Sequence, residues 1–504
     1  MVFDERKTRI ALDRGATLAN VSLHRSGFVA SPFQRADIDA SIDELETVLG
    51  DIDAELAHVQ AREGAYPAHA QNASGDERDG RDLTVTRLHV LREGVLRQLA
   101  LCRATIAPVR ALPGELLSEI FLLTSQPTSL EVREKRVCAI PALACVCFEW
   151  MCAAHATPAL WTSIHLGYGT RAHEQPALLA ALVARSGALP LDVTLSADDD
   201  ASSDALHALA RLSQHRWRSL TTRQPVLRGA FSLPLLDTLT VSATCVRALD
   251  LRALADAPQL RAAALTTQHL FFALPAWPAL ARLALDTRSV HGAEFRNADR
   301  ALRLHRRALE ALRLVEDEDA DAWEEAQGAL GEAYEMPRLR AVDMRLCAWP
   351  VLRPVVAPRL QTLTLRGCHR SEGLFAELAG GRVLGGHALR ELCVVGVDSA
   401  PALLEALPGL ERLRVVWPRH HTDMAEADTL RWLAFADGAQ AHSRLPNLTS
   451  FSFVSCLADE CTEACRPAVE ALMRLRETER SVDGITVKRL DELVTNLGDK
   501  YQIR

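Results

Sequence analysis

Apolar side chains recur at helical spacing in two stretches of the first hundred residues. In residues 36–63 they alternate at steps of four and three, the heptad pattern of a helix with one buried seam. A similar stripe follows a polar loop over 64–80. The first stripe comprises Ile38, Ile42, Leu45, Leu49, Ile52, Leu56 and Val59, and the second comprises Leu88, Leu91, Val95, Leu99, Cys102 and Ile106. Over 36–107 we expect two helices that fold back as an antiparallel hairpin, or else a homodimeric coiled coil. Residues 1–35 show no clear periodicity, which predicts a disordered tail.

A short helix with two apolar sides is predicted after Pro108. Pro113 and Glu115 suit the first turn of a helix. The apolar residues beyond them form two neighbouring stripes, Leu116, Ile120 and Leu123 on one side and Leu117 and Phe121 on the other. Because such a helix needs two surfaces to bury against, we expect one side to face its own domain and the other to face a partner.

The segment LACVCFEWMCAA, residues 143–154, predicts the next helix. Its apolar positions share one helical face and are Leu143, Val146, Cys147, Trp150, Ala153 and Ala154. Thr157-Pro158 should end this helix, and Leu160, Trp161 and Ile164 should pack back on it.

The cysteines of this segment raise the question of a metal site. Cys145, Cys147, Cys152 and His155 match no usual structural zinc spacing. On a helix the first two would point about 200° apart. We therefore predict no metal and no cofactor, and interpret Cys147 and Trp150 as contact residues of a docking surface.

The second half of the chain repeats one phrase, Pro-x-Leu-x-x-Leu-x-Leu. Its first leucine falls at Leu236, Leu260, Leu280, Leu309, Leu339, Leu360, Leu389, Leu410 and Leu448. Most intervals match the 20–29-residue period of leucine-rich repeats. The Leu-x-Leu pair predicts a short strand with its leucines facing inward. Since no unit can bury its face alone, we expect the units of 166–504 to stack into an irregular solenoid.

Composition narrows the class of protein. A chain of 504 residues is too long for one compact core. Its net charge of −8 argues against nucleic-acid binding. We find no run of eighteen apolar residues and no signal-peptide pattern, so we expect no membrane partner and a cytoplasmic or nuclear protein. No catalytic signature or phosphate-binding glycine motif surrounds any candidate nucleophile, which predicts a protein that is not an enzyme. A Cys–His enzyme within the second half stays open as an alternative.

The run LPGELLSEIF … LACVCFEWMCAAHATPALWTSI resembles an F-box, in the form common in mushroom-forming fungi. The elements that carry the resemblance are a Leu-Pro start, an acidic-apolar helix ending in Ile-Phe, Val-Cys-x-x-Trp, and Pro-x-Leu-Trp. With the preceding hairpin, the resemblance covers about residues 36–165. This chain departs from the family's pattern in one place, an irregular connector over 125–142 between the two helices.

The resemblance implies a three-helix F-box over 108–165 in the substrate-recognition subunit of a cullin–RING (SCF-type) ubiquitin ligase. In that family the F-box binds a small adaptor subunit, which links it to a cullin, and the C-terminal repeats hold a protein client. A scaffold that uses the same parts without ubiquitin transfer is the alternative. Carried over to this chain, the adaptor contacts would be Leu112, Pro113, Leu116, Leu117, Ile120, Phe121, Val146 and Trp150.

Polar residues beside the strand leucines should point to the concave face of the solenoid, where a client would bind. An arginine-lined arc suits carboxylates or phosphates. Ordinary solvated strand positions of an arginine-rich protein would look the same, and we favour that interpretation. The candidate client-binding residues are Arg282, Arg313, Arg345, Arg366, Arg412 and Arg414.

Overall fold

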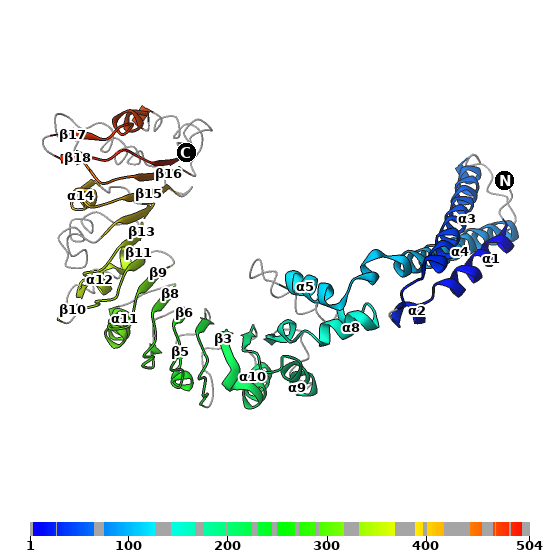
Figure 1. Ribbon diagram of the computed structural model, residues 1–504, viewed down its shortest axis with the longest axis horizontal. Coiled ribbons are helices and arrows are strands. Elements are labelled where there is room, and N and C mark those ends of the chain that lie inside the picture. The colour runs from blue at the N-terminus through cyan, green and yellow to red at the C-terminus, as the bar shows by residue number, and fades with distance from the viewer. Residues whose placement is uncertain are drawn as a thin grey trace. The chain divides into compact units, whose positions relative to one another are not determined.

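A computed structural model of the chain comprises two compact units (Figure 1). The helical unit is Met1–Thr162 with Arg185–Gly187, and the sheet unit is Ser163–Ala184 with Ala188–Arg504. The structure describes residues 4–26, 28–64, 75–125, 143–166, 176–196, 200–223, 230–243, 249–267, 272–287, 292–316, 332–367, 389–396, 401–417, 444–455, 467–468, 470–482 and 485–495.

Two long helices, α3 (Pro32–Gly64) and α4 (Gly75–Ile106), form the body of the helical unit. Two ion pairs show that they run antiparallel. Glu46 of α3 pairs with Arg103 of α4, and Asp53, which comes later in α3, pairs with Arg92, which comes earlier in α4, at 2.7 Å. Most of the predicted seam is buried between them, with α4 residues such as Val95 in the same apolar cluster, whereas Leu49 and Val59 are half-buried. The two stripes therefore cover each other within one chain. Of the two arrangements expected, an antiparallel hairpin and a homodimeric coiled coil, the structure has the hairpin.

The prediction of a disordered tail over 1–35 is wrong, because α1 (Glu5–Leu18) and α2 (Val21–Arg25) are folded helices. The Asp4 carboxylate caps α1 by accepting the N–H groups of Arg6 and Lys7. The fully buried residues of α1, which packs on α3 and α4, are small: Thr8, Ala11 and Gly15. A Cβ atom at Gly15 would lie 2.9 Å from Gln98 Cγ. The larger Leu12 and Leu18 are only partly buried against the same core, so the closest contacts of this helix give little apolar periodicity and the pattern missed it.

Two further helices follow in the helical unit. Helix α5 (Gly114–Ser125) comes after a 3-10 turn, η1 (Pro108–Ala111), and α8 (Phe148–His155) precedes another, η2 (Pro158–Trp161). The helix predicted over 143–154 is wrong in its first part, because the chain turns at 145–146 and extended Cys147 is the N-cap of α8. Leu160 and Trp161 are buried as expected, and the Trp161 indole N–H donates to the Ala154 carbonyl at 2.8 Å.

One 13-stranded sheet dominates the sheet unit, and its strands lie side by side in chain order. Every pairing within it is parallel. The strands are β1 (Ser163–Leu166), β2 (Leu191–Leu195), β3 (Trp217–Thr222), β4 (Thr238–Ala243), β6 (Ala262–Thr267), β8 (Arg282–Thr287), β9 (Ala311–Glu316), β11 (Ala341–Arg345), β13 (Thr362–Arg366), β14 (Glu391–Val395), β15 (Arg412–Trp417), β16 (Ser450–Ser455) and β19 (Glu492–Thr495).

Helices and short strands connect these strands. The helices with defined bounds include α9 (Pro176–Arg185), α10 (Asp200–Ser213), α11 (Gly292–His305), α12 (Trp349–Leu352) and α14 (Pro401–Glu405). Two-stranded sheets join β5 (Leu249–Asp250) to β7 (Phe272–Ala273), β10 (Tyr334–Glu335) to β12 (Val355–Val356), and β17 (Arg480–Val482) to β18 (Ile485–Val487). Within the sheet unit the main strands follow an arc, and α10, α11 and α12 lie on its outer side (Figure 1).

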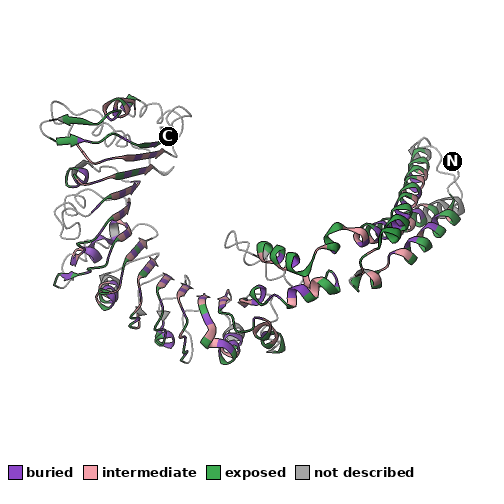
Figure 2. Cartoon of the chain, in the orientation of Figure 1, coloured by how far each residue is buried: buried purple, intermediate pink, exposed green. Residues whose placement is uncertain are grey.

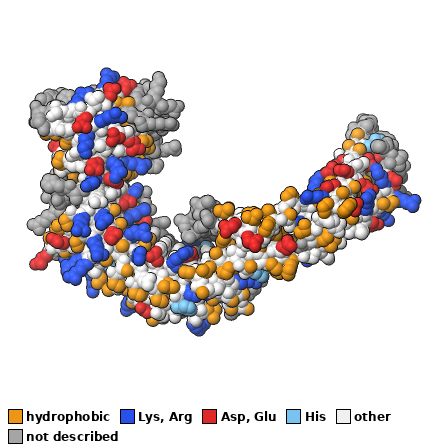
Figure 3. All heavy atoms as spheres, in the orientation of Figure 1, with side chains coloured by type: hydrophobic (Ala, Val, Ile, Leu, Met, Phe, Trp, Pro, Cys, Tyr) orange, Lys and Arg blue, Asp and Glu red, His pale blue; other side chains and the backbone are white. Residues whose placement is uncertain are grey.

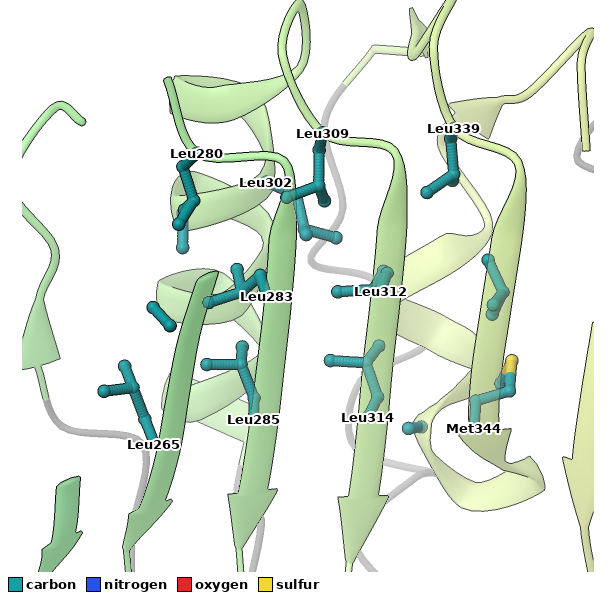
Figure 4. Packing of buried hydrophobic residues seen from close by; sticks show 14 of the residues in the cluster. Leu265, Leu280, Leu283, Leu285, Leu302, Leu309, Leu312, Leu314, Leu339 and Met344 are labelled. Atoms are coloured by element: carbon teal, nitrogen blue, oxygen red, sulfur yellow. The ribbon is translucent and has the colours of Figure 1, made fainter. Parts of the chain in front are cut away.

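The register places equivalent residues of the recurring phrase beside one another. Leu283 of β8 pairs with Leu312 of β9, which pairs with Val342 of β11, and the row continues through Leu363 of β13. Figure 4 shows the labelled leucines of β8 and β9 stacked in such rows, with Leu302 of α11 among them. Figure 2 shows buried positions along these strands, and the apolar core extends from them into the turns and helices that connect them. The chain is therefore a mixed protein with N-terminal helices and a long parallel sheet, compatible with a solenoid-like α/β fold.

A buried histidine links α11 to the segment before β8. The Trp277 backbone N–H donates to His305 Nε2 at 3.3 Å, so His305 Nδ1 carries the proton and donates to the Ala301 carbonyl at 2.9 Å. Both ring nitrogens are thereby committed to the neutral form. Burial lowers the pKa of His305 below its ordinary value of 6.5.

The sheet unit should lose stability as the pH falls below about 6.5, because the unfolded chain protonates His305 and the folded chain does not. The midpoint of urea unfolding, compared at pH 7.5 and pH 5, measures this loss. His305→Gln removes the titrating group and should shrink the difference, whereas His215→Gln at an exposed position should leave it unchanged. An equal pH dependence in all three proteins would show that His305 does not contribute.

Candidate functional site

The first candidate site is an apolar face of α5 in the helical unit. Leu116, Ile120 and Leu123 are 51%, 40% and 66% exposed, which is unusual for large aliphatic side chains on one helix. Their spacing of four and three places them on one side of α5. We call these three residues the α5 patch. Figure 3 shows hydrophobic side chains gathered over this part of the helical unit.

The opposite stripe of α5 holds the helix in its own unit. Leu117 and Phe121 are buried, and the Phe121 ring lies 5.1 Å from the Trp150 ring of α8 in a tilted arrangement. The Thr157 hydroxyl adds a polar contact at 2.8 Å to the Ser118 hydroxyl. One stripe of the helix is therefore used for folding, and the other is left without cover among the described residues.

The predicted adaptor contacts divide accordingly. Pro113, Leu116, Ile120 and Val146 are exposed, and Leu112 and Trp150 are half-buried. The assignment of Leu117 and Phe121 as surface contacts is wrong, because both form the core between α5 and α8.

The predicted adaptor contacts also leave out two exposed side chains in this region. Leu123 belongs to the same predicted stripe as Leu116 and Ile120, but the resemblance did not carry it over as a contact. Phe148 is 54% exposed at the first turn of α8. The direction of its side chain depends on the interruption of the helix at 145–147, which helical spacing does not predict. The connector over 126–142 lies outside the described residues.

The Trp150 indole lies in the same region, against Phe121. Its Nε1 atom is buried and finds no acceptor among the described residues. The neighbouring cysteines differ in exposure: Cys147 is buried at the N-cap of α8, whereas Cys145 and Cys152 are exposed. Within the described residues, no group of three or more His, Cys, Asp or Glu side chains could hold a metal ion.

The second candidate site is the face of the main sheet that carries the polar strand positions. A groove of about 500 Å³ crosses it from β4 to β13. The residues that line it from this face are Thr238, Ala262, Ala264, Arg282, Ala284, Ala311, Arg313, Ala341, Asp343, Thr362 and Thr364. Alanine methyl groups cannot fill the space above the strands, and this leaves the hollow.

All six predicted arginines belong to strands of this sheet, and they differ in their partners. Arg366 is held by Asp343 through hydrogen bonds of 2.8 and 3.1 Å, which raise its pKa. Arg313 lies farther from its two acidic neighbours, 3.8 Å from Asp343 and 4.0 Å from Asp286. Arg412 pairs with Glu391 of the adjacent strand. Arg282, Arg345 and Arg414 form no ion pair with any described residue.

Cys393 lies on the same face, paired in register between Thr364 and Arg414. The thiol is half-buried and free. Burial raises its pKa, more than the nearby Arg414 and Arg366 lower it. An activated thiol nucleophile needs the opposite shift, so this position does not favour Cys–His chemistry.

Comparisons with known proteins add no relative. Neither a scan against protein-family models nor a search of curated proteins found a match to this chain. None of the helices that the structure describes is both long enough and apolar enough to span a bilayer.

Proposed function

We propose that the protein is the substrate-recognition subunit of a cullin–RING (SCF-type) ubiquitin ligase. In this proposal residues 108–165 are an F-box that docks to the adaptor, and 166–504 are a leucine-rich-repeat solenoid that binds the client. The observation that carries it is the α5 patch. An aliphatic stripe that no described residue covers, on a helix whose other stripe is packed in the core, is typical of a protein–protein contact.

The sheet unit supports the second half of the proposal. Each strand of the main sheet pairs only with the main-sheet strands that precede and follow it in the chain, and the recurring leucines fall in register across them. That is the arrangement expected when short units stack because none can bury its own face. The uncovered polar face of such a stack gives an extended surface for another protein.

No bond chemistry is required of this chain in the proposed role. The helical unit fixes the protein to the adaptor and, through it, to the cullin, while the sheet unit holds the client. Binding both raises the effective concentration of client lysines near the charged ubiquitin-transfer enzyme. Proximity is therefore the whole contribution, with no cofactor or metal.

The adaptor contact can be tested by charging the α5 patch. The double variant Leu116→Glu and Ile120→Glu should weaken co-purification of the adaptor subunit at least about tenfold, because a carboxylate would have to be buried in an apolar contact. Since both side chains are exposed, the variant should fold normally. Leu304→Glu, at an exposed leucine of α11, is the matched control.

Adaptor recovery equal to that of the unmodified protein would contradict the F-box assignment. Recovery of the adaptor without any cullin would instead favour a scaffold that does not take part in ubiquitin transfer. The two outcomes are separated by probing the same purification for both subunits.

A further inference from the structure

The groove on the sheet unit is bordered by arginines whose charge the described residues neutralise only in part. Asp343 accepts two hydrogen bonds from Arg366, and Glu391 forms an ion pair with Arg412. Arg313 shares its two acidic neighbours only at the limit of ion-pair distance. Three further arginines, Arg282, Arg345 and Arg414, meet no acidic partner among the described residues. Figure 3 shows Lys and Arg side chains over the sheet unit, with Asp and Glu between them.

The hollow and the charges form one continuous surface. Arg282 lines the groove and pairs in register with Ala311, which pairs with Ala341 and then with Thr362. The next residues along this row are Glu391 and Arg412. The parallel row runs from Ala284 through Arg313, Asp343 and Thr364 to Cys393 and Arg414. The floor thus has short side chains, and guanidinium groups stand along both of its rows.

The size of this surface suits a short extended peptide. Five strand-to-strand steps separate β8 from β15, which amounts to about 24 Å at a spacing of about 4.8 Å. An extended chain that rises about 3.3 Å per residue covers this span with about seven residues. Guanidinium groups pair well with carboxylates, which can accept two parallel hydrogen bonds.

We infer that this face binds an extended, acidic segment of another protein, with its small side chains on the alanine floor and its carboxylates on Arg282, Arg313 and Arg414. A nucleic acid fits less well, because Asp286, Asp343 and Glu391 stand on the same face and the chain carries a net charge of −8. The segment is a client only if the proposed function holds, but the binding itself does not depend on the adaptor.

The test uses the full chain and a fluorescein-labelled 12-residue peptide of alternating Glu and Ala, with a Gln/Ala peptide as its uncharged match. Fluorescence anisotropy should show saturable binding of the acidic peptide that weakens as salt is raised. The Gln/Ala peptide should bind at least about tenfold more weakly, because charge-assisted hydrogen bonds are lost.

Charge reversal locates the site. Arg282→Glu with Arg414→Glu should weaken binding of the acidic peptide about 100-fold, at about tenfold for each of the two lost arginine contacts. The control, Arg338→Glu with Arg359→Glu, makes the same charge change at exposed residues outside the strands and should have little effect. If the charge-reversed variant unfolds, the milder double variant Arg282→Gln with Arg414→Gln serves for the same binding measurement.

Cys393 supplies a readout that needs no substitution. The acidic peptide should slow maleimide labelling of this thiol, followed by mass spectrometry of the Cys393 fragment, and the Gln/Ala peptide should not. Equal binding of the two peptides, equal loss in both charge-reversed pairs, or tighter binding of a single-stranded oligonucleotide would each overturn the inference. Because adaptor co-purification is scored separately through the α5 patch, failure here leaves the proposed function standing, and the reverse also holds.

Discussion

Truncation of Phe121 to alanine is expected to lower the free energy of unfolding of the α5–α8 pair by about 3–5 kcal/mol. The ring is 0% exposed and packs against Trp150, so its removal leaves a cavity in a small core with few other large side chains. Ile120→Ala, one residue earlier on the open face, should change the same quantity by no more than about 0.5 kcal/mol. Truncating two adjacent residues of one helix would then lower the free energy of unfolding by very different amounts.

Hydrogen exchange with mass spectrometry measures this difference, because it resolves α5 and α8 from the rest of the chain. Phe121→Ala should speed amide exchange in both helices and leave α3 and the sheet unit unaffected. Ile120→Ala should match the unmodified protein. Similar exchange rates in the two variants would mean that the buried and open faces of α5 have been assigned incorrectly, and the α5 patch would lose its significance.

Replacing Gly367 by alanine is expected to destabilise the middle of the sheet unit by about 3 kcal/mol or more. A Cβ atom at this position would lie 1.5 Å from the carbonyl oxygen of Gly396. The close approach exists because the Gly367 N–H donates to the Val395 carbonyl at 2.7 Å, just beyond the ends of β13 and β14. No rotamer change relieves a contact between a Cβ and a main-chain oxygen, so the two strand ends must separate.

Thermal unfolding of the Gly367→Ala variant, with exchange mapping of β13 and β14, checks this expectation. Gly50→Ala is the control, because nothing lies within 4 Å of a Cβ at that position of α3. Alanine there should leave stability unchanged or raise it by about 0.5–1 kcal/mol. A Gly367→Ala protein with unaltered melting would show that β13 and β14 part more readily than their register implies.

Much of the sheet unit could be predicted from the recurring leucines. The first leucine of each phrase, from Leu236 to Leu448, is buried, and a parallel strand follows it. This worked because a stacked unit has a fixed inward face and repeats it, so the same positions stay apolar from unit to unit. The long seam of α3 was readable for a similar reason, since a helix covered along one side needs regular apolar spacing.

The parts that pattern could not predict depend on contacts between residues far apart in the sequence. The most buried positions of helix α1 include Ala11 and Gly15, and small residues give little hydrophobic signal. On α5, spacing separates two apolar stripes but does not say which is buried, and this depends on where Trp150 lies. On the sheet, arginines that look alike in the sequence have different roles, because Asp343 holds Arg366 more tightly than Arg313.

The order of the strands also decides how the sheet unit bears mechanical load. Each strand of the main sheet hydrogen-bonds only to the main-sheet strands that precede and follow it in the chain, and β19 has a neighbour in that sheet on one side only. A pull on the carboxyl end therefore strains a single ladder, between β19 and β16, before any other. The unit should peel strand by strand and extend in small steps, whereas a sheet with crossed-over strands would rupture several ladders at once.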